Sequence, residues 1–356
     1  MNISFSCPWI GSRYIDSVFI LGPAFYSILI AFMLNHFFPS DSGLTLIHWI
    51  VFVLLIDVAH VYSSLYRTYL NPVETKKNIP ILLFTPIICF LTGFILYSID
   101  HIYFWRVLAY LAVFHFVRQQ YGFMRIYSRE DQSGHKNSKF FRVVDATTIY
   151  LATLYPLVYW HVNLPRNFNW FVENDFLVDV PGFLSLVVAI MYAISFLLFI
   201  SKEIYSYKKS IPINLPKIIF IIGTSLSWFV GIVLYNSDLI FTVTNVVSHG
   251  IPYFALVWIT GKNEIKKTPE LRDSYYKYFF ASYSLPLFLG LLFLLSFIEE
   301  GLWAGFVWRE HLDFFQIFSH LPVLEDRTTL ALVVPLLTLP QSTHYVLDGF
   351  IWKKKT

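Results

Sequence analysis

Apolar stretches of roughly 20 residues recur along this chain of 356 residues, separated by charged connections. A helix of that length crosses a hydrocarbon layer of ~30 Å. The pattern predicts an all-α fold, a polytopic integral membrane helix bundle that forms a single transmembrane domain over residues 1–356. About ten transmembrane helices are expected, at 15–35, 45–66, 79–99, 101–123, 143–162, 181–201, 217–236, 240–260, 279–298 and 329–351.

The composition supports a membrane protein, because hydrophobic residues make up 56% of the chain and charged residues only 14%. So few polar side chains would not cover a soluble globule. The two cysteines, Cys7 and Cys89, are too few for a disulfide framework or a thiolate metal site, so any metal must be bound by nitrogen and oxygen. The residues before the first stretch lack the features of a signal peptide, and we expect the first span to be retained.

Lysine and arginine are concentrated in alternate connections, those after the second, fourth, sixth, eighth and tenth stretches. Cytoplasmic loops carry such an excess, so both termini are predicted to be cytoplasmic, including a basic tail at 352–356. A multi-pass protein of the cell inner or plasma membrane is favoured. The net charge of +3 then reflects orientation signals, and no nucleic-acid partner is predicted.

Two connections on the predicted outer face are long and rich in aromatic residues, at 163–180 and 299–328. Aromatic side chains beside acidic ones suit segments that lie at the level of the lipid headgroups. These segments are therefore expected to be interfacial, as membrane anchors or as a lid.

Four histidines fall inside different apolar stretches: His60, His115, His249 and His344. Each precedes the next cytoplasmic basic residue by seven to thirteen positions, so their depths differ by only ~9 Å at ~1.5 Å per helical residue. Polar residues inside a membrane need partners, and four at one depth predict a shared site.

Each of these histidines has polar residues on its own helix, at spacings that bring side chains together. They are Asp57 before His60, Gln119 after His115, Asn245 before His249, and Gln341 and Asp348 on either side of His344. Arg118, next to Gln119, is expected to pair with Asp57 or Asp348, or to bind a lipid headgroup phosphate.

Imidazole and carboxylate ligands suit iron, zinc, copper or manganese. Non-haem iron is the first expectation, with zinc, copper and haem left open. The metal ligands are predicted to be His60, His115, His249, His344 and Asp57. Catalytic roles are expected for Asp57, Arg118, Gln119 and Asp348, while Asn245 and Gln341 orient the imidazoles.

A buried iron site near the cytoplasm predicts an oxidoreductase that acts on a membrane lipid or other apolar chain, with a cytoplasmic electron donor. The products would come from desaturation, hydroxylation or oxidative cleavage. The chain lacks the closely spaced histidine boxes of membrane desaturases, so it is assigned to no family. Three alternatives stay open: a proton-coupled transporter that uses the same residues, a haem-binding electron-transfer protein, and acyl transfer with His249 as the base.

Overall fold

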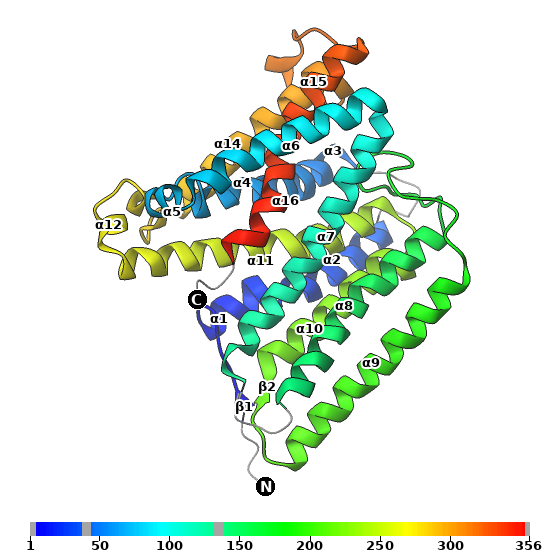
Figure 1. Cartoon of the computed structure of the whole chain (residues 1–356), viewed down its shortest axis with the longest axis vertical. Helices are drawn as coiled ribbons and strands as arrows, with labels where there is room; N and C mark the ends of the chain where they lie inside the picture. The colour runs from blue at the N-terminus through cyan, green and yellow to red at the C-terminus, as the bar shows by residue number, and fades with distance from the viewer. Residues whose placement is uncertain (1–4, 38–43, 132–137, 353–356) are drawn as a thin grey trace. The chain divides into compact units, whose positions relative to one another are not determined.

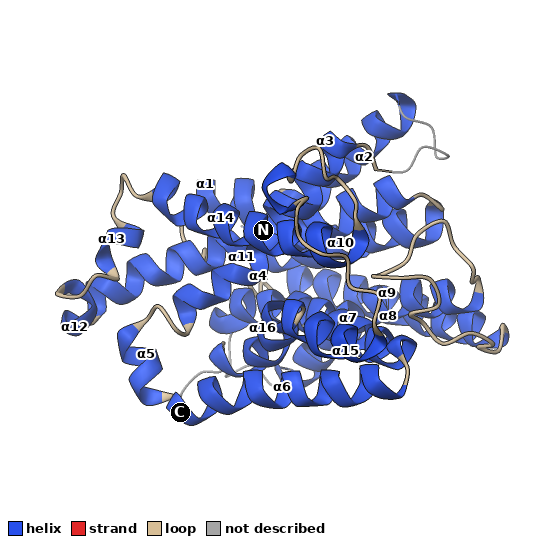
Figure 2. Ribbon diagram, turned by 90° about the horizontal axis from the view of Figure 1, so that it is seen from above, coloured by secondary structure: helices blue, strands red, loops and turns tan. Residues whose placement is uncertain are grey.

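The structure is a computed structural model that describes residues 5–37, 44–131 and 138–352. Almost all regular structure in these ranges is helical (Figures 1 and 2), so the predicted mainly-α fold is confirmed. The predicted basic tail at 352–356 lies outside the described residues except for Trp352.

The α-helices in chain order are α1 (Arg13–Asp16), α2 (Pro23–Phe37), α3 (Leu46–His48), α4 (Ala59–Ser63), α5 (Pro72–Lys77), α6 (Ile79–Ile99), α7 (His101–Tyr127), α8 (Ser138–Val162), α9 (Phe183–Lys208), α10 (Leu215–Trp228), α11 (Asp238–Lys267), α12 (Pro269–Arg272), α13 (Lys277–Phe280), α14 (Leu285–Trp303), α15 (Arg327–Leu337) and α16 (Leu339–Ile351).

Wider π-helical turns continue several of these helices, at Ser17–Leu21, Trp49–Val58, Phe229–Leu234 and Ala304–Trp308. Tighter 3₁₀ turns occur at Ser64–Arg67, Ser128–Glu130 and Gln316–Phe318. Two short strands, β1 (Phe5–Ser6) and β2 (Ile213–Asn214), pair in parallel with Phe5 opposite Ile213.

Six helices of the described ranges are long and apolar enough to cross a membrane, and up to eight if each of two bent pairs counts as one span. The bends are 45° before α2 and 44° before α16. The ten predicted stretches are helical over most of their length, but α7 and α8 are not among the six, so the count of ten spans stays a prediction. The six are Leu46–Arg67, Ile79–Ile99, Phe183–Lys208, Leu215–Leu234, Asp238–Lys267 and Leu285–Trp308.

The chain forms two compact units, which are described separately, and the expected single transmembrane domain stays a prediction. Unit 1 contains 1–43, 116–169 and 176–252; unit 2 contains 44–115, 170–175 and 253–356. Helices α7 and α11 each contribute residues to both units.

In unit 1, α8 packs against α9 and α10, and α10 packs against α2 (Figure 1). A buried ion-pair network of Asp131, Asp145, Lys202 and Lys217 joins α8, α9 and α10 to the residues that follow α7. Lys217 Nζ lies 2.9 Å from Asp145 Oδ2 and 2.8 Å from Asp131 Oδ2, and Lys202 also binds Asp145. Lys202 was expected in the connection after the sixth stretch, but it lies inside α9, where it pairs with Asp145 and Glu203.

In unit 2, α6 packs against α15 and α16, and α4 contacts α14 and α16. The approach of α6 requires Gly93, because a Cβ there would lie 2.9 Å from Cβ of Pro335. Pro340 in the first turn of α16 has no N–H to continue the ladder of α15, which accounts for the bend at Thr338. This bend gives α16 its own direction, and α16 carries His344.

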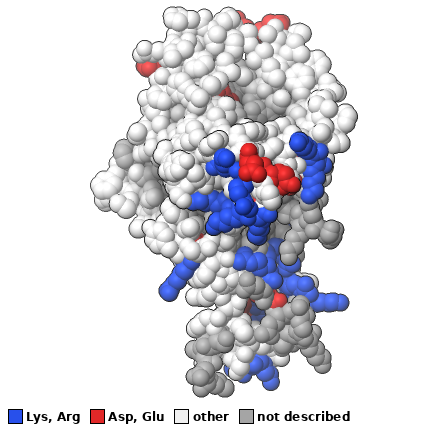
Figure 3. Space-filling view, turned by 90° about the vertical axis from the view of Figure 1, so that its left-hand side faces the viewer, with Lys and Arg blue, Asp and Glu red and all other residues white. Residues whose placement is uncertain are grey.

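One end of unit 2 is basic. The helices α5, α11 and α12 end here, and the face in Figure 3 shows basic side chains beside a small acidic group. Arg67 pairs with Glu264, which also accepts a hydrogen bond from Asn71 at 3.2 Å. The basic residues of these three helices are Lys76, Lys77, Lys262, Lys266, Lys267 and Arg272, and Arg67 lies in the 3₁₀ turn that precedes α5.

Candidate metal centre

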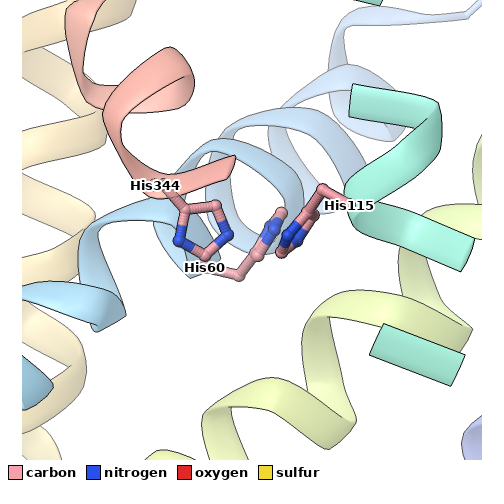
Figure 4. Close-up of side chains that lie close together, drawn as sticks. All are labelled: His60, His115 and His344. Atoms are coloured by element: carbon pink, nitrogen blue, oxygen red, sulfur yellow. The ribbon is translucent and has the colours of Figure 1, made fainter. Parts of the chain in front are cut away.

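Three of the four predicted histidines meet inside unit 2, and we call them the histidine triad: His60, His115 and His344. They come from α4, α7 and α16, and their rings point toward one another (Figure 4). Each is almost fully buried, at 1–2% exposure. Residues 55 and 229 positions apart in the sequence are thus brought to one point by the packing of unit 2.

The rings are close enough to share one ion. One ligand atom from each histidine lies within 4.8 Å of the other two. The ring centroids of His115 and His344 are 4.5 Å apart, and those of His60 and His344 are 5.3 Å apart. Imidazole nitrogens that bind one tetrahedral ion at about 2.0–2.1 Å lie roughly 3.3 Å from one another. Side-chain rotations that move each ring nitrogen by about 1 Å would therefore bring the triad into coordination distance.

His344 provides the test of whether a metal fits. Among the described residues, neither Nδ1 nor Nε2 of this ring has a hydrogen-bond partner. Each buried polar atom without a partner costs about 1–3 kcal/mol. A metal ion bound to one nitrogen would offset part of that cost, so the residues present fit a metal ion.

Two aspartates stand beside the other two rings. Asp57 Oδ1 lies 3.6 Å from Nδ1 of His60, and Asp348 Oδ2 lies 3.5 Å from Nδ1 of His115. A carboxylate near Nδ1 favours the tautomer that leaves Nε2 as the metal ligand. The carboxylates also supply negative charge that balances a divalent cation.

Asp348 is itself held by two aromatic side chains. Its Oδ1 accepts hydrogen bonds of 2.6 Å from the Tyr253 hydroxyl and of 2.6 Å from Nε1 of Trp352. Both donors were overlooked as partners of this aspartate in the sequence. The i, i+4 spacing of Asp348 and Trp352 was the available signal.

Glu299 is a buried acid that the sequence reasoning placed in the outer connection 299–328. The helix instead runs on through α14 and its π-helical extension to Trp308, so Glu299 is only 4% exposed inside it. Its carboxylate accepts a hydrogen bond of 2.6 Å from the Tyr62 hydroxyl and another from Nε2 of Gln341. The apolar run GLWAGFVW after Glu300 was the signal that the helix continues.

The remaining predicted residues belong to unit 1. The His249 ring stacks on Phe116 with centroids 3.6 Å apart. Nε2 of Gln119 donates to the His249 carbonyl at 2.9 Å, and Nδ2 of Asn245 donates to the Phe241 carbonyl at 3.0 Å. These amides bind backbone rather than imidazole, and the assignment of His249 as a ligand stays a prediction.

Arg118 is exposed, and its guanidinium hydrogen-bonds the Tyr150 hydroxyl at 2.5 Å and lies over the Tyr121 ring. Its observed partners are therefore tyrosines rather than an aspartate.

Comparisons with known proteins give no family for this chain. No family model matches it, and neither a curated protein nor a solved structure matches it. The geometry of the triad is therefore the basis for a functional proposal.

Proposed function

We propose that this chain is a multi-pass membrane protein whose histidine triad binds one non-haem iron ion, and that the site oxidises a lipid or another apolar chain. The observation that carries the proposal is the set of three buried imidazoles within 4.8 Å, one of them with both nitrogens unpartnered among the described residues.

A site with three protein ligands suits catalysis better than structure. Structural zinc sites are closed by four ligands, whereas catalytic metals keep a position open for water or substrate. Imidazole binds iron, copper and zinc, but zinc has no redox chemistry, so oxidation of an apolar chain requires one of the other two.

Bound iron would supply dioxygen activation and one-electron chemistry. For a hydroxylation, C–H plus dioxygen, two electrons and two protons gives C–OH plus water. For a desaturation, two C–H bonds, dioxygen, two electrons and two protons give C=C and two waters. The electrons would come from the cytoplasmic donor expected from the sequence.

The chain's own residues hold and surround this chemistry. Asp348 and Asp57 orient His115 and His60, and the Asp57 side chain keeps 38% exposure, which lets it meet a substrate or a proton donor. Tyr345, whose ring lies 5.2 Å from His115, contributes to an apolar wall. Burial of the triad excludes bulk water from a reactive centre.

The haem alternative is disfavoured by the same distances. Three imidazole nitrogens converge within 4.8 Å of one another, whereas a haem iron would use at most two imidazole ligands.

A proton-coupled transporter is the second candidate, supported by the Tyr62–Glu299–Gln341 hydrogen bonds. Both flanking residues sit close in sequence to a triad histidine, Tyr62 two after His60 and Gln341 three before His344. Such an acid–amide–hydroxyl chain inside apolar helices is typical of proton relays. This candidate predicts that the purified protein contains no metal.

The deciding experiment is elemental analysis and an optical spectrum of detergent-purified protein. We expect about one iron per chain and no Soret band. Separate His60→Ala, His115→Ala and His344→Ala variants should each lose the iron.

Matched controls are His36→Ala in α2 and His101→Ala at the exposed start of α7, which should keep the iron. Iron content that is equal in all five variants, or absent from the unmodified chain, contradicts the proposal. A Soret band would return the haem reading.

A further inference from the structure

One tyrosine contacts the histidine triad and also the partly exposed end of α16. The Tyr253 ring lies 6.0 Å from that of His60 and 5.3 Å from that of His344, edge-on to both. On its other side it lies 6.0 Å from the Trp352 ring. Tyr253 is 1% exposed, so it forms a buried aromatic link between the triad and Trp352.

The hydroxyl of Tyr253 has a proton acceptor within hydrogen-bond distance, Oδ1 of Asp348 at 2.6 Å. A phenol that loses an electron becomes a strong acid and must release its proton. A carboxylate takes that proton, whereas a backbone carbonyl does not. Tyr66, another buried tyrosine of unit 2, donates to the carbonyl of Phe288 and provides the contrast.

Trp352 carries a cation over its ring, because the guanidinium carbon of Arg67 lies 5.0 Å from the ring centroid. A neighbouring positive charge disfavours a cation radical on the indole by Coulomb repulsion. Electrons can therefore pass through the Trp352 ring, but an oxidised state is more stable at Tyr253, which can shed its proton.

We propose that Tyr253 is a redox-active residue that passes single electrons to the triad's metal ion. Tyr253 loses one electron and its hydroxyl proton and becomes a neutral tyrosyl radical. The electron lowers the oxidation state of the oxidised metal by one, and the proton moves to Oδ1 of Asp348. A one-electron donor on the cytoplasmic side then reduces the tyrosyl radical through Trp352, and Asp348 returns the proton. The net change is one electron from donor to metal, and this step rests on the proposed function.

The test uses full-length protein loaded with iron(II), oxidised with hydrogen peroxide and frozen for electron paramagnetic resonance. We expect a radical signal that narrows when the protein is made with ring-deuterated tyrosine. Tyr253→Phe keeps the ring but lacks the hydroxyl, so it should abolish the signal while iron content is unchanged. Tyr66→Phe, the matched control, should retain both.

Trp352→Phe gives a second readout, because it removes the indole while leaving Tyr253 and its proton acceptor in place. The radical should form in this variant but decay several-fold more slowly when a chemical reductant is added. An unchanged decay would overturn the role of Trp352 as the route of re-reduction.

Three results overturn the redox role of Tyr253: a signal that persists in Tyr253→Phe, iron-loaded protein that forms no radical, or loss of iron from Tyr253→Phe. The last would mean that the tyrosine only holds Asp348 in position. Unmodified protein that binds no iron is a different failure, since it removes the proposed function and the tyrosine's role with it.

Discussion

Each unit buries a polar cluster among apolar helices, and the two clusters differ in how their polar atoms are satisfied. In unit 1 the ammonium groups of Lys202 and Lys217 share the carboxylate of Asp145, so the charges are neutralised within the chain. In unit 2 both ring nitrogens of His344 are without a hydrogen-bond partner among the described residues. Buried polar groups are almost always paired, so the unpartnered nitrogens of His344 need an explanation, and a bound ion would supply one.

The largest effect is expected from breaking the buried ion-pair network of unit 1. Asp145→Asn removes the carboxylate that Lys202 and Lys217 share and leaves them only Glu203 and Asp131, which should lower the free energy of unfolding by up to about 3 kcal/mol. Thermal or denaturant unfolding in detergent measures this loss. Iron content per folded chain should be unchanged, and a stable Asp145→Asn protein would mean that the network contributes little.

Removing a histidine of the triad should instead affect metal affinity more than stability. His344→Ala removes one of three ligands, and we expect metal affinity to fall about 100-fold or more, by analogy with the free energy that each ligand contributes in small metal sites. Stability of the metal-free protein should fall less than in Asp145→Asn, because removal of an unpartnered imidazole offsets part of the lost ring packing. Competition with a chelator measures the affinity, and unaltered binding would exclude His344 as a ligand.

A smaller effect on metal binding is expected at Asp348, the carboxylate beside His115 of the triad. Asp348→Asn keeps the shape of the side chain but removes the charge beside Nδ1 of His115, which should weaken metal binding about 10–100-fold. Tyr253→Phe, which removes only one of the two donors to this carboxylate, should leave metal binding unchanged. The reverse ranking of these two variants would argue against Asp348 as the group that orients His115.

The smallest effect on the metal is expected at the fourth histidine. Because the His249 ring stacks on Phe116, His249→Gln should lower stability through lost packing and leave iron content unchanged. Elemental analysis of this variant beside His344→Ala makes the comparison direct. Loss of iron from His249→Gln would restore His249 as the fourth ligand predicted from the sequence.

Hydropathy and loop charge predict where a histidine lies along its helix, and this was enough to group four of them. They do not locate it around the helix, or say which helices are neighbours. His60, His115 and His344 meet as expected from their depth, whereas the same reasoning could not show that His249 belongs to the other unit. The packing of α4, α7 and α16 decides which histidines meet, and that packing depends on side chains throughout the chain.

Two charged residues at the ends of predicted stretches lie inside helices instead. The sequence places Glu299 and Lys202 in connections, since charged residues are typical of the ends of apolar stretches. In the structure each lies inside a helix, where a partner on a neighbouring helix satisfies it. For Glu299 and Lys202 that partner lies in a distant part of the chain, so the local pattern did not indicate it.

The bend at Thr338 has a consequence for the order in which the molecule assembles. His60 and His115 lie on helices made early, while His344 lies beyond the bend on a helix of 13 residues. Contacts between residues so distant in sequence carry a large loop-closure cost. Docking of this short helix is thus expected to complete the triad, because His60 and His115 lie on helices that precede it in the chain.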